Sequence, residues 1–459
     1  MSRSGVTIGI DIGTTAVKAV AADEDGHVTA RVRIPHRLRV PAPDRLEHDA
    51  DEAWRRGPLA ALDQLDRPDA RAVAVSAMVP SLTAVDSAGR PITPGLLYGD
   101  ARGRIPGAPA EPAQPLPAVG EAAGFLRWTT AEAPDAAGYW PAPAVANHAL
   151  AGEAVIDSAT AITAFPLFDG NGWNPAECAD RGATVERMPR VEAIGAATGQ
   201  VRGTGATLAV GAIDAVCEQI VAGADRDGDV LVMCGTTLIV WITIPDYRQV
   251  PGLWTIPHTA AGKFQIGGAS NAGGLFLGWV DRILAPGDAA GDLANVDPRR
   301  VPVWSPYIRG ERTPFHDPDR RAALAALDLT HDAASLRRAA YEASGFVVRQ
   351  LIELSGMPVA RIVASGGGTR VEPWMQAMAD ATGRPVEVSG VAEGAALGAA
   401  FLGRLAAGLE STIADAARWG STECVVEPQA AWAQAVADRY GRFLELGDRP
   451  SRRGLSNRV

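Results

Sequence analysis

A single stretch close to the N-terminus sets the pattern for the chain: Val6-Thr-Ile-Gly-Ile-Asp11-Ile-Gly13-Thr14-Thr15-Ala-Val-Lys18-Ala-Val-Ala-Ala-Asp23. An apolar run leads into an acidic residue, then a Gly-Thr-Thr corner, then a second β-rich run, which predicts two strands joined by a turn. The corner exposes backbone N–H groups and two hydroxyls that suit phosphate oxygens, and the carboxylate of Asp11 beside it suits a phosphate-bound Mg²⁺. For this stretch alone, an ordinary edge hairpin with a glycine-rich turn is the alternative.

The same corner recurs far along the chain, in Val230-Leu-Val-Met-Cys-Gly235-Thr236-Thr237-Leu-Ile-Val-Trp-Ile-Thr243. Copies of a strand–corner–strand unit so far apart indicate two similar domains and not a solenoid. Two such cradles, facing each other across a cleft, could hold the phosphates of one nucleotide between them. Alternating strand and helix patterns in the rest of the chain predict an α/β fold.

The size and charge of the chain narrow its class. With 459 residues it is too long for one core, and we expect two domains, at residues 1–243 and 244–448, followed by a frayed tail at 449–459. The formal net charge of −10 argues against nucleic acid and against an anionic membrane surface as partners. An anionic substrate would therefore need a local basic or metal-lined pocket.

The cysteines and histidines of the sequence indicate no metal site or catalytic site. The four cysteines show no metal-type pairing, and three of them lie in or beside apolar runs, as small buried residues do. We find no signal peptide and no apolar run of membrane-spanning length, so we expect a cytoplasmic protein. His48, His148 and His316 have no partner pattern, and we expect them in loops or on the surface.

Two further motifs complete a set suited to phosphoryl transfer. A strand ending in Gly211 leads to a helix that opens near Asp214, whose carboxylate is either a helix cap or a catalytic base. Another strand leads into the triple glycine at residues 366–368. Phosphoryl transfer needs backbone donors for phosphates, Mg²⁺ between phosphate oxygens and a base aimed at the acceptor hydroxyl. Three glycine-rich corners and two carboxylates in this order supply these parts.

Taken together, the motifs resemble those of the FGGY carbohydrate kinases, whose domains have the ribonuclease-H-like fold shared with hexokinase and actin. The resemblance extends over most of the chain and implies two α/β domains flanking a nucleotide- and sugar-binding cleft. Besides the two phosphate corners, the matching stretches are Ser305-Pro-Tyr-Ile-Arg-Gly-Glu311-Arg312-Thr-Pro314, Ser365-Gly-Gly-Gly-Thr-Arg-Val-Glu-Pro-Trp374-Met-Gln376 with Asp380, and the small-residue helix from Glu393 to Ala399.

The resemblance also implies roles for individual residues, with ATP and Mg²⁺ as the cofactors. Asp214 would take the proton of the sugar hydroxyl, and Asp11 would support the Mg²⁺ site. The resemblance implies that Glu311 and Arg312 belong to a structural element near the cleft and are not catalytic, with a surface ion pair of little energetic value as the alternative interpretation. The phosphates would lie against Gly13, Thr14, Thr15, Gly235 and Thr236, and the adenosine against Gly274, Gly367 and Gly368, where a side chain would clash.

The sugar is expected to lie against Met78, Val79, Asp100, Arg102 and Asp214. Xylulose kinases usually show Gln-Met-His-Gly where this chain has Ala-Met-Val-Pro at residues 77–80, which removes a hydrogen-bond partner for a sugar hydroxyl. The Trp-x-Asp-x-Arg of the family appears as Tyr-Gly-Asp-Ala-Arg at residues 98–102, and the segment after it is shorter and richer in proline and alanine. A ketopentose such as xylulose or ribulose is the favoured acceptor.

Three alternatives stay open at this point. The acceptor could be another polyol or a sugar acid. The chain could be a nucleotide-binding regulator that has lost turnover, although it retains Asp11, Asp214 and both Gly-Thr-Thr corners. A chaperone-like or filament-forming ATPase is disfavoured because a separate substrate-binding domain and a charged tail block are lacking. The oligomeric state is open, with a homodimer as one candidate.

Overall fold

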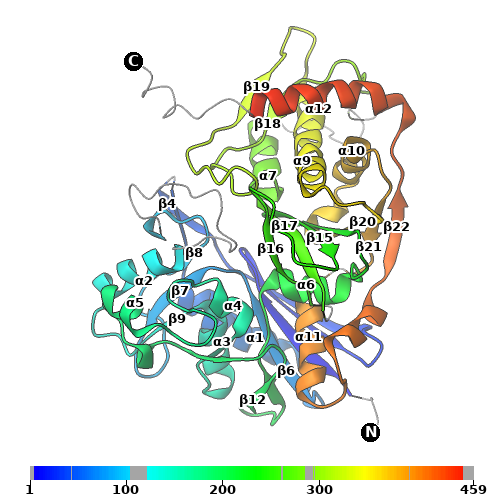
Figure 1. Cartoon of the computed structure of the whole chain (residues 1–459). Helices are drawn as coiled ribbons and strands as arrows, with labels where there is room; N and C mark the ends of the chain where they lie inside the picture. Colours follow the sequence, from blue (N-terminus) through cyan, green and yellow to red (C-terminus); the bar gives the residue numbers. More distant parts are fainter. Residues whose placement is uncertain are drawn as a thin grey trace. The chain divides into compact units, whose positions relative to one another are not determined.

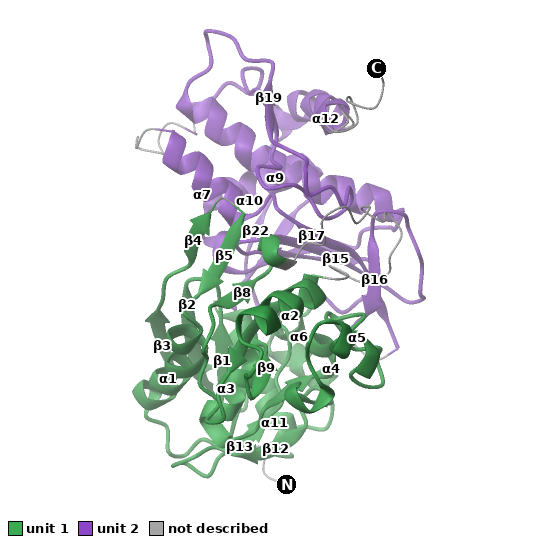
Figure 2. Cartoon of the chain, turned by 90° about the vertical axis from the view of Figure 1, so that its left-hand side faces the viewer, with its two compact units in different colours: residues 1–109, 116–223, 393–420 green, residues 110–115, 224–392, 421–459 purple. Residues whose placement is uncertain are grey.

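The computed structural model describes residues 5–42, 44–103, 121–259, 262–284, 293, 295–391 and 393–447. By internal contacts the chain forms two compact units, coloured separately in Figure 2. Unit 1 comprises residues 1–109, 116–223 and 393–420, and unit 2 comprises residues 110–115, 224–392 and 421–459. Each unit has its own β-sheet with helices packed on it, so both are α/β.

Unit 1 contains a six-stranded sheet in the order β12-β13-β6-β1-β2-β3. β1 and β2 pair antiparallel on either side of the first Gly-Thr-Thr corner, whereas β6 pairs in parallel with both β1 and β13. The strands are β1 (Thr7–Ile12), β2 (Ala16–Ala22), β3 (Val28–Pro35), β6 (Ala72–Ala77), β12 (Ala197–Gln200) and β13 (Thr207–Ala209).

The two faces of β1 carry different residues, because alternate side chains of a strand point to opposite sides. Its three isoleucines are fully buried in a core shared with α1 (Gly57–Leu65) and α3 (Ala142–Ala151). On the other face, a Cβ at Gly9 would lie 1.8 Å from the carbonyl oxygen of Ala396 in α11 (Gly394–Ala406). Only glycine lets this small-residue helix lie so close to the strand. Asp11 shares the face of Gly9.

Unit 1 also contains a five-stranded sheet in the order β4-β5-β8-β7-β9 and the parallel pair β10 and β11. These strands are β4 (Arg39–Ala42), β5 (Arg45–His48), β7 (Ser81–Val85), β8 (Gly95–Leu97), β9 (Gly138–Trp140), β10 (Val155–Asp157) and β11 (Arg190–Glu192). The remaining helical elements are η1 (Asp51–Arg56), η2 (Ala101–Gly103), α2 (Glu121–Glu132), α4 (Ser158–Ile162), α5 (Pro175–Asp180), η3 (Val185–Arg187), α6 (Asp214–Ala222) and η5 (Ile413–Trp419).

Unit 2 is built on a seven-stranded sheet in the order β16-β17-β15-β14-β20-β21-β22. β14 and β15 flank the second Gly-Thr-Thr corner and pair antiparallel, and β14 also pairs in parallel with β20. The strands are β14 (Asp229–Cys234), β15 (Leu238–Ile244), β16 (Trp254–Pro257), β17 (Phe264–Ser270), β20 (Arg361–Ser365), β21 (Val386–Ser389) and β22 (Thr422–Val426), with β18 (Val303–Ser305) and β19 (Ala323–Ala325) as a separate pair.

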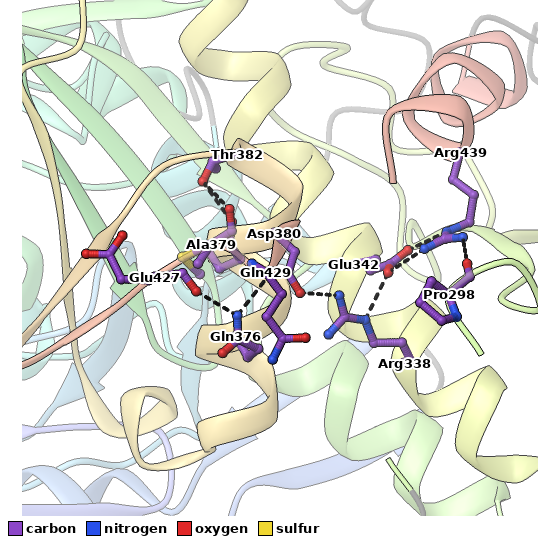
Figure 3. Close-up of polar contacts among 11 residues, drawn as sticks. Pro298, Arg338, Glu342, Gln376, Ala379, Asp380, Thr382, Glu427, Gln429 and Arg439 are labelled. Carbon is purple, nitrogen blue, oxygen red and sulfur yellow. Dashed lines mark hydrogen bonds and ion pairs between the residues drawn. The ribbon is translucent and has the colours of Figure 1, made fainter. Parts of the chain in front are cut away.

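The helices α7, α9, α10 and α12 lie on one side of the unit 2 sheet (Figure 1). They share an apolar core with the sheet that includes Phe276, Phe346, Trp374 and Phe443. A buried ion network connects α9, α10 and α12 (Figure 3). The helical elements are α7 (Gly274–Ile283), α9 (Ala333–Ser355), η4 (Gly367–Arg370), α10 (Glu372–Thr382), η6 (Ala430–Trp432) and α12 (Ala433–Gly447).

The units divide the chain differently from the expected domains at residues 1–243 and 244–448. The long segment of unit 2 begins at residue 224, ahead of β14, because β14 pairs with β15 and β20 inside the unit 2 sheet. Residues 393–420 return to unit 1, because α11 packs on β1, β2 and β6. The expected frayed tail at 449–459 lies outside the described residues.

In the part of the chain that the structure describes, helices of sufficient length and apolar character to cross a membrane are absent.

Candidate active site

The unit 1 sheet brings two carboxylates to the same edge. Asp11 and Ser76 are partners in the parallel pairing of β1 with β6. β6 also pairs in parallel with β13, and beyond that pairing a further parallel bridge joins Ala77 to Ile213. Asp214, the next residue, begins α6 directly beyond the carboxyl end of β6. In α/β sheets, ligands bind outside the carboxyl ends of parallel strands.

Burial raises the pKa of both carboxylates, and the charge of Asp11 raises that of Asp214 further. Burial raises the pKa of Asp11 to about 6, with Lys18 across the hairpin opposing the shift and Glu218 adding to it. Burial raises the pKa of Asp214 to about 7, and the charge of Asp11 adds to that rise. The backbone N–H of Ala215 donates to Asp214 Oδ1 at 2.7 Å, and this hydrogen bond lowers the pKa of Asp214. A carboxylate with a pKa near 7 is suited to proton transfer at neutral pH.

Asp11 also fits a metal ligand. Its Oδ1 is buried and accepts no hydrogen bond from the described residues, so an oxygen lone pair is left for a cation. Groups of three or more His, Cys, Asp or Glu able to hold a metal are absent from the described chain. Mg²⁺ needs no such group, because it usually binds through one or two carboxylates together with substrate phosphates and water.

The first Gly-Thr-Thr corner is held by hydrogen bonds from its own backbone and from Tyr98 and His48. The N–H of Gly13 donates to the Ala16 carbonyl at 3.1 Å, and Thr14 Oγ1 lies 3.1 Å from the Tyr98 hydroxyl oxygen. His48 Nε2 lies 2.8 Å from the Thr14 carbonyl oxygen. Thr15 is exposed. The corner therefore has a fixed backbone and an accessible outer side.

The expected position of His48 in a loop or on the surface is wrong. It ends β5 and is fully buried. Trp54 Nε1 donates to its Nδ1 at 3.0 Å, so Nε2 carries the proton and donates to the corner. Burial, reinforced by His36, lowers the pKa of His48 to about 4, so this tautomer is neutral at physiological pH.

The expected sugar residues divide into two groups. Asp100 is fully buried, and its oxygens accept from the Leu46 N–H and from Arg102 at 2.7 to 2.9 Å. Arg102 Nη2 also donates to Glu47 at 2.7 Å, and its guanidinium lies 4.7 Å from the centroid of the Trp128 ring. Both side chains are thus engaged within unit 1. Met78 is buried and Val79 is partly exposed at the end of β6.

In unit 2 the second corner is joined to the start of α7. The N–H groups of Gly274 and Leu275 donate to the carbonyls of Gly235 and Thr236 at 2.8 and 3.1 Å. A Cβ at Gly274 would lie 2.9 Å from the Gly235 carbonyl oxygen, so the chain itself requires glycine there. Gly235 is exposed and Thr236 is partly exposed.

The three glycines at residues 366–368 stand at their positions for different reasons. Gly366 has a φ of +93°, and a Cβ at Gly368 would lie 2.2 Å from the Trp374 ring and 2.7 Å from the Cys234 carbonyl oxygen. A Cβ at Gly367 would meet no atom within 4 Å. At Gly274 and Gly368 the steric requirement thus comes from the protein itself. Gly367 alone has the open space that approach of a ligand would need.

The interpretation of Glu311 and Arg312 as a surface ion pair is wrong. Glu311 is buried and accepts hydrogen bonds from the Ser270 hydroxyl at 2.9 Å and from the backbone N–H of Asn271 and Arg312. Burial raises its pKa to about 7. Arg312 Nη2 donates to Thr237 Oγ1 at 3.2 Å. Both residues therefore belong to the surroundings of the second corner.

Comparison with known proteins identifies the family. The model for the N-terminal domain of the FGGY family of carbohydrate kinases matches residues 6–105, and the model for its C-terminal domain matches residues 230–407. These matches cover more than half of the chain, so the chain belongs to the FGGY family of carbohydrate kinases. The family prediction is confirmed, and the chain is a carbohydrate kinase.

Relatives and solved structures agree with this assignment. The chain is 27% identical over 460 residues to the gluconokinase of Bacillus subtilis (strain 168), with 87% of each chain covered. It is 24% identical over 448 residues to the xylulose kinase of Escherichia coli (strain K12), covering 88% of this chain and 91% of that one. The fold matches ligand-bound xylulose kinase from Lactobacillus acidophilus with a TM-score of 0.80 at 20% identity, covering 96% and 97% of the two chains. The predicted two-domain α/β fold is confirmed.

Proposed function

We propose that this kinase transfers the γ-phosphoryl group of Mg·ATP to a hydroxyl of a small sugar, with Asp214 taking the hydroxyl proton. One observation carries the proposal: Asp214 lies at the carboxyl edge of the unit 1 sheet beside Asp11, with its pKa raised to about 7. A buried carboxylate beside a second carboxylate is the arrangement that tunes an acid to act as a base near neutral pH.

The other residues of the proposed site bind the metal and the nucleotide. Mg·ATP supplies the electrophilic phosphoryl group. The unsatisfied Oδ1 of Asp11 fits the metal, and the corners at residues 13–15 of unit 1 and 235–236 of unit 2 each suit phosphate oxygens of the nucleotide. Gly367 offers the open approach for adenosine, while Gly274 and Gly368 set the backbone around it. Asp214 orients the acceptor hydroxyl and holds its proton.

We assign a ketopentose such as xylulose or ribulose as the acceptor. The charged groups that act on Asp214 are Asp11, Glu218 and Lys18, which together favour a neutral acceptor over an anionic one. The xylulose kinase relative is consistent with this choice. A sugar acid is the second candidate, supported by the gluconokinase relative of similar coverage.

ADP release with Mg·ATP and a panel of ketopentoses, polyols and sugar acids tests the acceptor. We expect the kcat/KM of one ketopentose to exceed that of gluconate by at least about tenfold, because an unpaired carboxylate near like charges is penalised by more than about 1.4 kcal/mol. A preference for gluconate would reverse the substrate assignment while leaving the kinase reaction intact. ATP binding without turnover on any sugar would favour the non-catalytic regulator.

The pH dependence of kcat/KM tests the base. Asp214 must be ionised to accept a proton, so activity is lost as pH falls below its pKa of about 7. We expect kcat/KM to rise roughly tenfold per pH unit up to about pH 7 and then to level off. The measurement runs from about pH 5 to about pH 9 with saturating Mg·ATP, within the range where the protein stays folded. A flat profile over this range would show that another group takes the proton.

A further inference from the structure

An arginine beside the second Gly-Thr-Thr corner, Arg312, forms no ion pair with the described residues. Arg312 Nη2 donates to Thr237 Oγ1 at 3.2 Å, whereas Arg312 Nε is buried and has no hydrogen-bond partner in the described chain. Among the described residues, no carboxylate forms an ion pair with its guanidinium. A partly buried guanidinium is stable only if an anion or several acceptors satisfy it. Something outside the protein is therefore expected to complete its contacts.

The backbone around Arg312 is held firmly. Its N–H donates to Glu311 Oε1 at 2.7 Å, and the N–H of Thr313 donates to the Ala269 carbonyl at 3.2 Å at the end of β17. Glu311 directs its carboxylate to the Ser270 hydroxyl and the Asn271 N–H. The charge of Arg312 acts on Glu311, but the carboxylate oxygens are directed to the Ser270 hydroxyl and to backbone N–H groups and form no ion pair with the guanidinium.

The N-terminus of α7 is not available to bind the negative charge of a phosphate at this corner. A helix N-terminus can bind phosphate through its unsatisfied N–H groups. Here the N–H groups of Gly274 and Leu275 already donate to the carbonyls of Gly235 and Thr236. The helix therefore holds the corner in place, and the cation for an anionic ligand has to come from a side chain. Arg312 lies beside the corner and already contacts it through Thr237.

We infer that Arg312 binds the phosphate chain of the nucleotide at the second corner, a contact that rests on the proposed function. A guanidinium presents a planar fork of donors that matches phosphate oxygens, and such charge-assisted hydrogen bonds are about twice as strong as neutral ones. Thr237 accepts from Arg312, so its own hydroxyl proton is free to donate to a phosphate oxygen. The chain has a net charge of −10, so it needs a local positive charge to bind a polyanion, and Arg312 supplies one.

Nucleotide binding by calorimetry tests the inference without turnover. We expect Arg312→Gln to weaken ADP binding by about 10- to 100-fold and to change adenosine binding by less than about twofold, because only ADP carries the phosphates. Arg312→Lys, which retains the charge but loses the fork, should fall between the two. Arg300→Gln removes the same charge from an exposed site and should bind ADP like the parent.

The outcomes separate this inference from the proposed function. Equal losses for ADP and adenosine in Arg312→Gln would overturn it, because they would show a general disturbance of the site. Unchanged ADP binding in Arg312→Gln would overturn it as well, while the kinase proposal stands. A parent protein that binds neither ADP nor ATP would overturn both. If Arg312→Gln proves unstable, Arg312→Lys carries the same comparison of ADP with adenosine.

Discussion

Replacement of Asp214 by asparagine is expected to lower kcat by about 10²- to 10⁴-fold, the range typical of a positioned general base. The change preserves the size of the side chain and removes its ability to accept a proton. ADP binding should be nearly unchanged, because Asp214 is proposed to contact the acceptor hydroxyl and not the nucleotide. Turnover is measured by ADP release with the best acceptor at saturating Mg·ATP.

Asp157→Asn is the matched control. Asp157 is also a buried carboxylate of unit 1 whose pKa burial raises to about 6. Its oxygens accept from the Thr160 N–H at 2.8 Å and the Thr160 hydroxyl at 2.5 Å, as the N-cap of α4. We expect this variant to lose stability and keep turnover. Equal loss of turnover in the two variants would contradict a specific role for Asp214.

The stability of Asp214→Asn should change in the opposite direction to its activity. The pKa of Asp214 is about 7 in the folded protein, above its ordinary value of 3.8, so the folded state binds the proton more tightly. The associated stability is present at low pH and is lost as pH rises through about 7. At about pH 8 the neutral asparagine avoids this loss, and we expect Tm to lie a few degrees above that of the parent. Near pH 4 the difference should disappear.

Replacement of Glu342 by glutamine is expected to lower the free energy of unfolding by about 3–5 kcal/mol, the cost typical of breaking a buried ion network. Glu342 accepts from Arg338 Nε at 2.9 Å and from Arg439 Nε and Nη2 at 2.6 and 2.8 Å (Figure 3). Arg338 also donates to Asp380 at 2.7 Å. Removing the central charge leaves buried arginines short of an anion.

The loss is expected because this network anchors α12 to α9. Arg439 belongs to α12 and reaches Glu342 of α9, while Asp380 of α10 accepts from Arg338 and from the Gln429 N–H at 2.7 Å. Thermal or urea unfolding measures the effect. Asp297→Asn breaks an ion pair with Arg300 in which both side chains are more than half exposed, and it should cost less than about 1 kcal/mol. Similar losses in both variants would show that burial does not matter here.

The candidate site shows what a sequence can predict. Asp11 and Asp214 are recognisable locally, one before a glycine corner and the other at a helix start. That they share an edge depends on β13 and β6 pairing in parallel, a contact between distant segments that local patterns do not specify. The assignment of β14 to unit 2 has the same origin, because its partner β20 lies more than a hundred residues downstream.

Buried polar residues were hardest to place. His48 and Glu311 belong to residue types that are mostly exposed, so a surface position was the natural expectation. Each is buried because partners outside its own element satisfy it: the distant Thr14 and the nearby Trp54 for His48, and the distant Ser270 and Asn271 for Glu311. The expectation that Gly274 and Gly368 make room for adenosine stays a prediction, and neighbouring backbone and side-chain atoms of this chain independently require glycine at both positions.

The central claim is that this chain moves a phosphoryl group from ATP to a sugar hydroxyl with Asp214 as the base. The most direct test is ³¹P nuclear magnetic resonance of Mg·ATP incubated with the best ketopentose and either the parent or Asp214→Asn. We predict a sugar phosphomonoester resonance that grows in step with ADP in the parent and is lost in the variant. Formation of inorganic phosphate in place of the monoester, or an undiminished monoester in the variant, would contradict the account.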